Sequence, residues 1–301
     1  MLDIKDSKVA IPVVLIAGLF WSLGPYVVRH IDEAQQVPWQ YLFTRGIVIF
    51  VILNLYLYLE EGNEFIKNYT KIGASGAIGG FGLGVAMIAF IYSITNTTAA
   101  VTLLCLAAMP FITALLGFLF LKENVSLNVW ISIAIASIGI LIMSFDNTGK
   151  NTFTGLVFGI VSSLGFSVFS VSLRWKKDTP KFTTVAIAGL FCCFFSAAMI
   201  IFNDLNFLST GKNQALFATH GSLVCLGLIL YSIGSKNIPA AELTLLSLTE
   251  VIGGIFWVWI PILGINEIPS QGTIIGGFFI FLSIIYYSLI IRTNRRFIGL
   301  N

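Results

Sequence analysis

The sequence predicts an all-α polytopic membrane protein with ten transmembrane helices, arranged as two inverted five-helix repeats with both termini in the cytoplasm. Three observations lead to this fold class: the composition, the length of the apolar stretches and an internal repeat. The 301-residue chain is 57% hydrophobic and 10% charged, with a mean hydropathy of +0.92. A soluble chain carries roughly 25% charged residues, so we expect this chain to be surrounded by lipid.

Ten apolar stretches fill almost all of the chain. About 20 apolar residues span the hydrocarbon core of a bilayer, and a helix satisfies every backbone polar group there. The connections between the stretches are short and leave no room for a soluble domain. The predicted spans are Val9–Val28, Pro38–Leu59, Ile72–Ser93, Thr98–Leu121, Leu127–Phe145, Phe153–Ser172, Phe182–Phe202, Ala218–Gly234, Ala240–Leu263 and Gly272–Ile291.

The distribution of basic residues predicts the orientation, because cytoplasmic loops are enriched in Lys and Arg. With the N-terminus inside, most of the 17 Lys and Arg residues lie on the cytoplasmic side, whereas Arg29, Lys150 and Lys212 lie outside. An even number of spans then returns the C-terminus to the cytoplasm.

Several other function classes are disfavoured. The net charge is only +3, and no basic cluster interleaves with aromatic residues, so nucleic acid is not an expected partner. An enzyme would need a nucleophile with a base, a metal cluster or paired acids, but the only histidines, His30 and His220, lie near the predicted outer surface. We expect no cofactor and no metal. The cysteines lie in apolar stretches and are interpreted as packing residues: Cys105, Cys192, Cys193 and Cys225.

The two halves of the chain resemble each other. The segment "GLFWSLG" at Gly18–Gly24 returns as "GIVSSLG" at Gly159–Gly165, 141 residues later. The pairs Tyr92-Ser93 and Tyr231-Ser232, Ala99-Ala100 and Ala240-Ala241, and the residues Glu123 and Glu267 follow at offsets of 139 to 144. Each half holds five spans, an odd number, so the second half is inverted, as in many secondary transporters. The predicted repeats are residues 1–146 and 147–301.

These motifs resemble the EamA branch of the drug/metabolite transporter superfamily. The resemblance rests on "GLFWSLG", on "PWQYLFTRG" at Pro38–Gly46, on the Ala-Ala start and Pro110 of the fourth span, and on the Glu-then-Gly ending of each half. In that branch glycines follow the glutamate at nine and sixteen residues. Each copy here keeps one of the two: Ser132 and Gly139 follow Glu123, and Gly276 and Ser283 follow Glu267.

The resemblance implies a ten-helix bundle in a bacterial cytoplasmic (inner) membrane that moves small metabolites by alternating access. It also implies that the first, third, fourth, sixth, eighth and ninth spans surround a central cavity.

Glu250 is the most informative single residue. It lies about 15 Å along the ninth span, near the membrane midplane, where an ionised carboxylate costs roughly 2.5–3.5 kcal/mol. Its counterpart at an offset of 141 is Met109, so the symmetry of the scaffold does not require the acid. We expect Glu250 to bind a substrate amine or to carry a coupling proton. A structural hydrogen bond to a neighbouring helix is the alternative.

Helical spacing places Ser247, Glu250, Gly254 and Trp257 on one face of the ninth span. The matching face of the fourth span carries Thr102, Cys105, Met109 and Thr113, and together the two faces would line a pocket with one negative pole. With residues of the first and sixth spans, the predicted substrate-binding set is Glu250, Trp21, Ser22, Ser247, Trp257, Met109, Thr102 and Ser163.

Three further residues are candidates for a gate or an ion pair. Arg45 lies about 10 Å below the outer surface and would bind a substrate carboxylate, hold an outer gate, or extend to the interface. Its depth differs from that of Glu250, so no salt bridge between them is expected. Tyr92 and Tyr231 lie near opposite faces and are either gates or interfacial aromatics. Pro25 and Pro110 predict helix kinks.

The predicted function is a secondary transporter of a small amine-bearing or zwitterionic solute, such as an amino acid. A multidrug or organic-cation exporter is the alternative, followed by a channel or a lipid scramblase. The expected partners are a small-molecule substrate, a coupling proton and the lipid bilayer. The sequence leaves open the solute, the direction of transport, the coupling ion and the oligomeric state.

Overall fold

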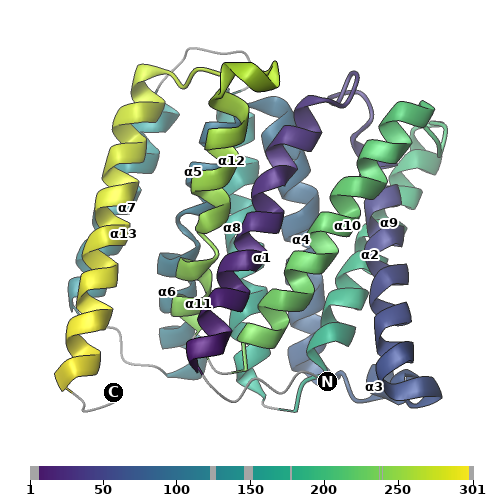
Figure 1. Cartoon of the computed structure of the whole chain (residues 1–301), viewed down its shortest axis with the longest axis horizontal. Coiled ribbons are helices and arrows are strands. Elements are labelled where there is room, and N and C mark those ends of the chain that lie inside the picture. Colours follow the sequence, from purple (N-terminus) through teal and green to yellow (C-terminus); the bar gives the residue numbers. More distant parts are fainter. Residues whose placement is uncertain are drawn as a thin grey trace.

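A computed structural model describes residues 7–122, 127–145, 152–176, 178–236, 238 and 240–297. Within these residues, all regular structure is helical (Figure 1). Glu123 of the first Glu-then-Gly motif lies outside them. The all-α expectation is therefore confirmed for the described part of the chain.

Seven helical segments of this part are long and apolar enough to cross a membrane. Six of them contain one long helix each, in which the backbone polar groups satisfy one another, as a bilayer requires. These six helices are α1 (Ser7–Arg29), α2 (Pro38–Glu61), α4 (Gly73–Asn96), α8 (Thr152–Trp175), α9 (Lys181–Phe202) and α10 (Gly211–Gly234).

The seventh candidate span, Ala99–Leu121, consists of two helices, α5 (Ala99–Leu106) and α6 (Met109–Leu121). The ninth predicted span is broken in the same way into α11 (Ala240–Leu246) and α12 (Thr249–Trp259). Both breaks fall near the middle of the bundle. The apolar runs predicted one continuous helix in each case.

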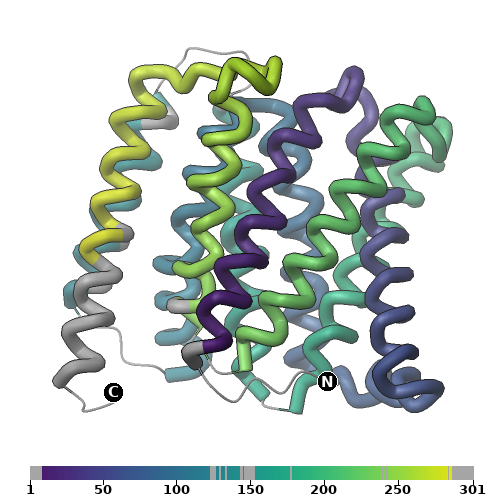
Figure 2. The backbone as a smooth tube through the Cα atoms, in the orientation of Figure 1, coloured from purple at the N-terminus to yellow at the C-terminus, as the bar shows by residue number. Residues whose placement is uncertain are grey.

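The remaining elements are shorter or lie at the edge of the bundle. Helices α7 (Leu127–Ser144) and α13 (Gln271–Phe297) pack against each other at one edge (Figure 2). The connection after α2, expected as a loop, contains η1 (Gly62–Phe65) and α3 (Ile66–Thr70), and η2 (Pro261–Leu263) follows α12.

Helix α10 begins seven residues earlier than the predicted start at Ala218. The hydroxyl oxygen of Thr210 accepts a hydrogen bond from the backbone N–H of Asn213 at 3.3 Å and caps the helix. The helix therefore starts at a polar capping residue, although its first turns are not apolar enough to be predicted as part of a span.

The helices pack in a recurring pattern of pairs. Helix α4 packs against α8, and α1 packs against α10; α8 also contacts α6, and α1 contacts α12. Glycines allow two of the closest crossings. A Cβ atom added to Gly165 would lie 2.5 Å from the carbonyl oxygen of Gly82, and one added to Gly46 would lie 2.7 Å from that of Gly189. These residues bring the backbones of α4 and α8, and of α2 and α9, into direct contact.

Candidate substrate cavity

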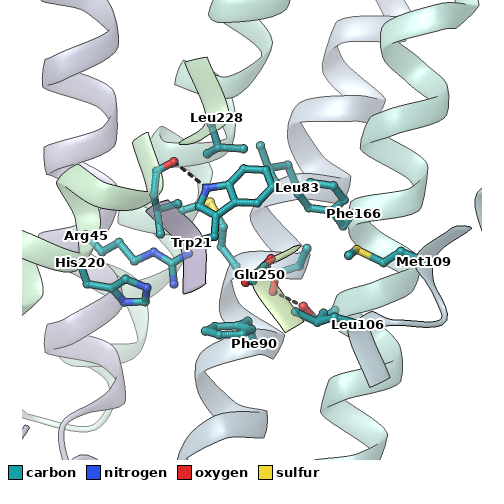
Figure 3. Close-up of a pocket in the computed structure, with 14 residues that line it drawn as sticks. Trp21, Arg45, Leu83, Phe90, Leu106, Met109, Phe166, His220, Leu228 and Glu250 are labelled. Atoms are coloured by element: carbon teal, nitrogen blue, oxygen red, sulfur yellow. Dashed lines mark hydrogen bonds between the residues drawn. The ribbon is translucent and has the colours of Figure 1, made fainter. Parts of the chain in front are cut away.

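A cavity of about 60 Å³ lies at the centre of the bundle (Figure 3). Helices α1, α2, α4, α8, α10 and α12 and both sides of the α5–α6 break contribute to its wall. The lining side chains are Trp21, Arg45, Leu83, Ala86, Met87, Phe90, Leu106, Met109, Ser162, Phe166, His220, Val224, Leu228 and Glu250.

The break between α11 and α12 positions Glu250. The N–H of Glu250 donates to the carbonyl oxygen of Ser247 at 2.9 Å, and that of Val251 donates to Leu248 at 3.0 Å, so the chain makes a tight turn before α12 begins. Glu250 then lies in the first turn of α12, where the partial positive charge of a helix N-terminus favours a carboxylate. The half-buried side chain faces the cavity.

Helix α2 supplies a cation to the same cavity. The side chain of Arg45 is 4% exposed, and its Nε and Nη1 atoms have no hydrogen-bond partner in the described part of the chain. Figure 3 shows Arg45 beside His220 at one side of the cavity, with Glu250 and Trp21 toward its middle. Polar atoms of a buried guanidinium that lack partners are costly, and an anionic group beside them would lower that cost.

Arg45 and Glu250 face one cavity, although their positions in the sequence suggested different depths. A long Arg side chain reaches well beyond its own helical turn, so Arg45 can line the same cavity as Glu250 from a different depth. Among the described residues, no ion pair joins the two side chains. The cavity therefore has a basic side chain, Arg45, on one wall and an acidic side chain, Glu250, on another, and the two do not form an ion pair.

His220 is held in place from α2 as well. The hydroxyl group of Tyr41 forms a hydrogen bond with Nδ1 of His220, and both side chains are buried. Tyr41 precedes Arg45 by one helical turn, so one face of α2 both fixes His220 and presents the guanidinium.

Aromatic side chains form the remaining wall. The indole N–H of Trp21 donates to the carbonyl oxygen of Val224 at 3.2 Å, which fixes the ring across the cavity. The Trp21 ring packs against Phe166 and Tyr231, with centroid distances of 5.6 and 5.5 Å. The hydroxyl group of Tyr231 hydrogen-bonds to that of Ser170 at 2.7 Å. Tyr231 is fully buried, so it is a packing neighbour of the cavity wall and is not at an open interface.

The structure brings four of the predicted residues together at the cavity: Glu250, Trp21, Met109 and Arg45. The other members of the predicted binding set lie outside its lining. The helix break is one reason for Ser247, because it separates this residue from Glu250 and Trp257, which both lie on α12.

These side chains have other partners. The Trp257 indole N–H donates to the Ser22 hydroxyl at 3.1 Å. Ser247 donates to the carbonyl oxygen of Thr244 at 2.7 Å, and Ser163 donates to that of Cys105 at 2.7 Å. The hydroxyl groups of Thr102 and Ser93 bond to each other at 2.8 Å. Each of these polar side chains therefore forms a hydrogen bond within the bundle.

Two predicted residues lie elsewhere in the bundle. Tyr92 is half-buried near the end of α4 and packs against Trp39 and Phe158, with centroid distances of 5.1 and 5.2 Å. Pro25 lies inside α1 and faces Gly254. Pro110, by contrast, lies in the first turn of α6. It therefore marks the end of the break between α5 and α6, and it does not bend a continuous helix as predicted.

His220, Phe90 and Phe166 line the cavity but were not predicted from the sequence. A lone histidine in a span gives no spacing signal, and phenylalanines are too common in this chain to stand out. Arg29, predicted only to lie on the outer side, joins several helix ends at one end of the bundle. The side chain of Arg29 bonds to Glu267 at 2.8 Å and donates to the carbonyl oxygens of Ile94 and Thr97 at 2.7 and 2.9 Å.

Glu267 completes this cluster. Its second carboxylate oxygen accepts a hydrogen bond from the N–H of Ala99, the first residue of α5, at 2.5 Å. The Arg29–Glu267 pair thus ties the end of α1 to the end of α4, the start of α5 and the segment after α12.

A helical bundle with several membrane-spanning segments and a polar cavity at its centre defines a multi-pass integral membrane protein. Residues 8–145 match the model of the EamA-like transporter family, which confirms the resemblance suggested by the motifs. Two relatives from strains of Helicobacter pylori are 24% and 26% identical over 256 and 260 residues; each alignment covers 82% of this chain and 84% of the relative. Both relatives are described as uncharacterized transporters.

A solved crystal structure has the same fold, with a TM-score of 0.65 and 16% identity, covering 95% of this chain and 99% of the other. The family match and the names of the relatives indicate a non-enzymatic membrane transporter. Its bacterial relatives indicate the inner membrane.

Proposed function

We propose that the protein is a secondary transporter of a small zwitterion, such as an amino acid, which binds between Arg45 and Glu250. The observation that carries this proposal is the buried guanidinium whose Nε and Nη1 atoms lack partners, in the same cavity as a carboxylate. The carboxylate of the solute would bind Arg45, and its amine would bind Glu250.

A zwitterion suits the cavity better than an ion of one sign. An organic cation would neutralise Glu250 but leave Arg45 uncompensated and repelled, and an anion would leave Glu250 uncompensated. The aromatic wall of Trp21, Phe90 and Phe166 would contact the rest of the solute. Arg45 therefore separates this proposal from the organic-cation alternative.

Glu250 has a second role open to it, the transfer of a coupling proton. A proton on Glu250 would remove the negative wall and favour release of the amine, so the two roles are compatible within one transport cycle. Uptake measured with and without a pH gradient distinguishes a binding role alone from a coupled one.

We further propose that residues 1–146 and 147–301 are two inverted five-helix repeats that make ten crossings. The pairing of helices supports this: α4–α8 corresponds to α1–α10, and α6–α8 corresponds to α1–α12. The two helix breaks support it as well. Gly18 of α1 approaches Thr249 at one break, and Gly159 of α8, 141 residues later, approaches Cys105 beside the other.

Alternating access is the mechanism that this arrangement favours. The cluster around Arg29 and Glu267 ties the helix ends together at one side of the bundle. A cavity of about 1000 Å³ lies at the other side. We infer that opening toward the Arg29 side requires these bonds to break, while the centre of the bundle retains the solute.

Ligand-dependent thermal stability tests the site. We expect amino acids to raise the Tm of the purified protein, and we expect their decarboxylated amines and their N-acetylated acids to have no effect. Arg45→Gln and Glu250→Gln should each weaken binding at least about thirtyfold, because truncating one member of a buried charge pair costs 2 kcal/mol or more. Both variants should lose uptake in proteoliposomes, whereas the exposed Glu64→Gln should retain it.

Equal stabilisation of the wild type by an amine and by the matching amino acid would contradict the zwitterion proposal and favour an organic cation. Wild-type uptake by Glu250→Gln would remove Glu250 from the mechanism.

A further inference from the structure

The second cavity lies at one face of the bundle, at the ends of α2, α8 and α10 and the start of α9, toward the bottom of Figure 1. Its volume is about 1000 Å³, far larger than the central cavity. No residue is shared between the linings of the two cavities. This face cavity is therefore a separate place where a ligand can bind.

Basic side chains outnumber acidic ones in its lining. The lining residues include four cations, Lys71, Arg174, Lys181 and Lys236, and two acids, Glu61 and Asp178. Glu61 accepts a hydrogen bond from the Asn68 amide at 2.7 Å. Lysines at a membrane face also occur simply because cytoplasmic loops are basic, so the charge alone does not define a site.

Two buried hydroxyl groups supply an independent observation. Ser232 and Thr183 both line the face cavity, and both are 0% exposed. Neither hydroxyl oxygen has a hydrogen-bond partner among the described residues. Buried polar groups are normally paired, so these two hydroxyl groups remain available to bond a polar ligand at the cavity.

The start of α9 adds backbone donors at the same place. Helix α9 has 22 residues, and its N-cap position holds Pro180, whose side chain makes no capping hydrogen bond. The next three residues, Lys181 to Thr183, all line the cavity, and the first N–H groups of a helix have no acceptor within it. The helix dipole favours an anion there.

We propose that the face cavity binds a phosphate group, held by Lys181 and Lys236, the hydroxyl groups of Ser232 and Thr183, and the N-terminus of α9. Lys181 already donates to the Ser235 hydroxyl at 2.9 Å, which holds its ammonium group over the helix start. Lysines act as point charges for phosphate, and hydroxyl and backbone donors complete its coordination. The phosphate can belong to a lipid headgroup or to a soluble ion.

The Tm of the full-length protein, measured with two probes, tests the proposal. The first probe is inorganic phosphate, compared with chloride at equal ionic strength in an uncharged detergent. The second is phosphatidylglycerol, compared with an uncharged lipid that lacks a phosphate group, in nanodiscs. A rise in Tm with inorganic phosphate identifies a site open to a soluble ion, and a rise only with phosphatidylglycerol identifies a lipid site. A rise with neither probe overturns the proposal.

Variants locate the site. Lys181→Gln should weaken phosphate binding about tenfold through the loss of a charge-assisted hydrogen bond, and Ser232→Ala should weaken it about fivefold. The control Lys67→Gln changes an exposed lysine that is absent from the lining of this cavity. An equal effect of Lys67→Gln would show a diffuse charge effect and contradict the site.

Ser232→Ala keeps the test valid if Lys181→Gln does not fold, because the Ser232 hydroxyl makes no bond that its removal would break. Glu250→Gln should leave the response to phosphate unchanged. The phosphate-site proposal and the central-site proposal can therefore fail independently of each other.

Discussion

Two helix pairs at the centre of the bundle use glycine for opposite purposes. In the α4–α8 pair, Gly82 and Gly165 face each other, and the two backbones touch. In the α1–α10 pair, Gly24 faces the ring of His220 and Gly227 faces the ring of Trp21. The first pair uses the missing side chain to close a contact, whereas the second uses it to accommodate two cavity residues. Glycines thus allow close backbone contact between α4 and α8, and they leave room for cavity side chains between α1 and α10.

Gly165→Val should disturb the sealed pair most strongly. The added Cβ would lie 2.5 Å from a backbone oxygen that cannot rotate away, so we expect a loss of about 3 kcal/mol of stability. Thermal unfolding in detergent measures this loss. Gly211→Val is the matched control, because nothing lies within 4 Å of a Cβ at Gly211. An equal fall in Tm for both variants would show that the close crossing is not needed.

Gly227→Ala tests the other pair and should affect binding more than folding. Its Cβ would lie 2.1 Å from Nε1 of Trp21, a side chain that can move into the cavity. We expect the Trp21–Val224 hydrogen bond and part of the ring packing to be lost, which lowers substrate affinity about tenfold. Titration calorimetry with the best-binding amino acid measures this change. Unchanged affinity would mean that Trp21 is not part of the site.

Tyr41→Phe should have the smallest effect. The substitution removes the hydroxyl group that bonds to His220 and should lower the free energy of unfolding by about 1 kcal/mol. Tyr69→Phe provides a comparison, since the Tyr69 hydroxyl donates to Asn54 at 2.8 Å, away from the cavity. We expect only Tyr41→Phe to change uptake. A similar uptake for both variants would reduce the Tyr41–His220 bond to a structural role.

The two broken helices show where prediction from the sequence stopped. The apolar run from Ala99 to Leu121 predicts one span, and it is one span in length, but the chain turns before Met109. Pro110 was read as a kink, and it lies at the helix start. No proline marks the other break, before Thr249. The segment is also apolar on both sides of the break, so neither signal predicted it. The break interrupts the predicted face at Ser247, whereas Glu250 lies on α12 and lines the central cavity.

The sequence alone determined the surroundings of the protein, its helical class and its likeness to the EamA-like transporters. Each of these depends on local composition or on motifs, because a bilayer forces an apolar chain into helices. The assembly of the cavity depended on the tertiary structure. Arg45, His220 and Glu250 come from three helices far apart in the chain, and only the packing of α2, α10 and α12 brings them to one cavity. Helical periodicity describes a single helix, and it carries no information about which faces of distant helices meet.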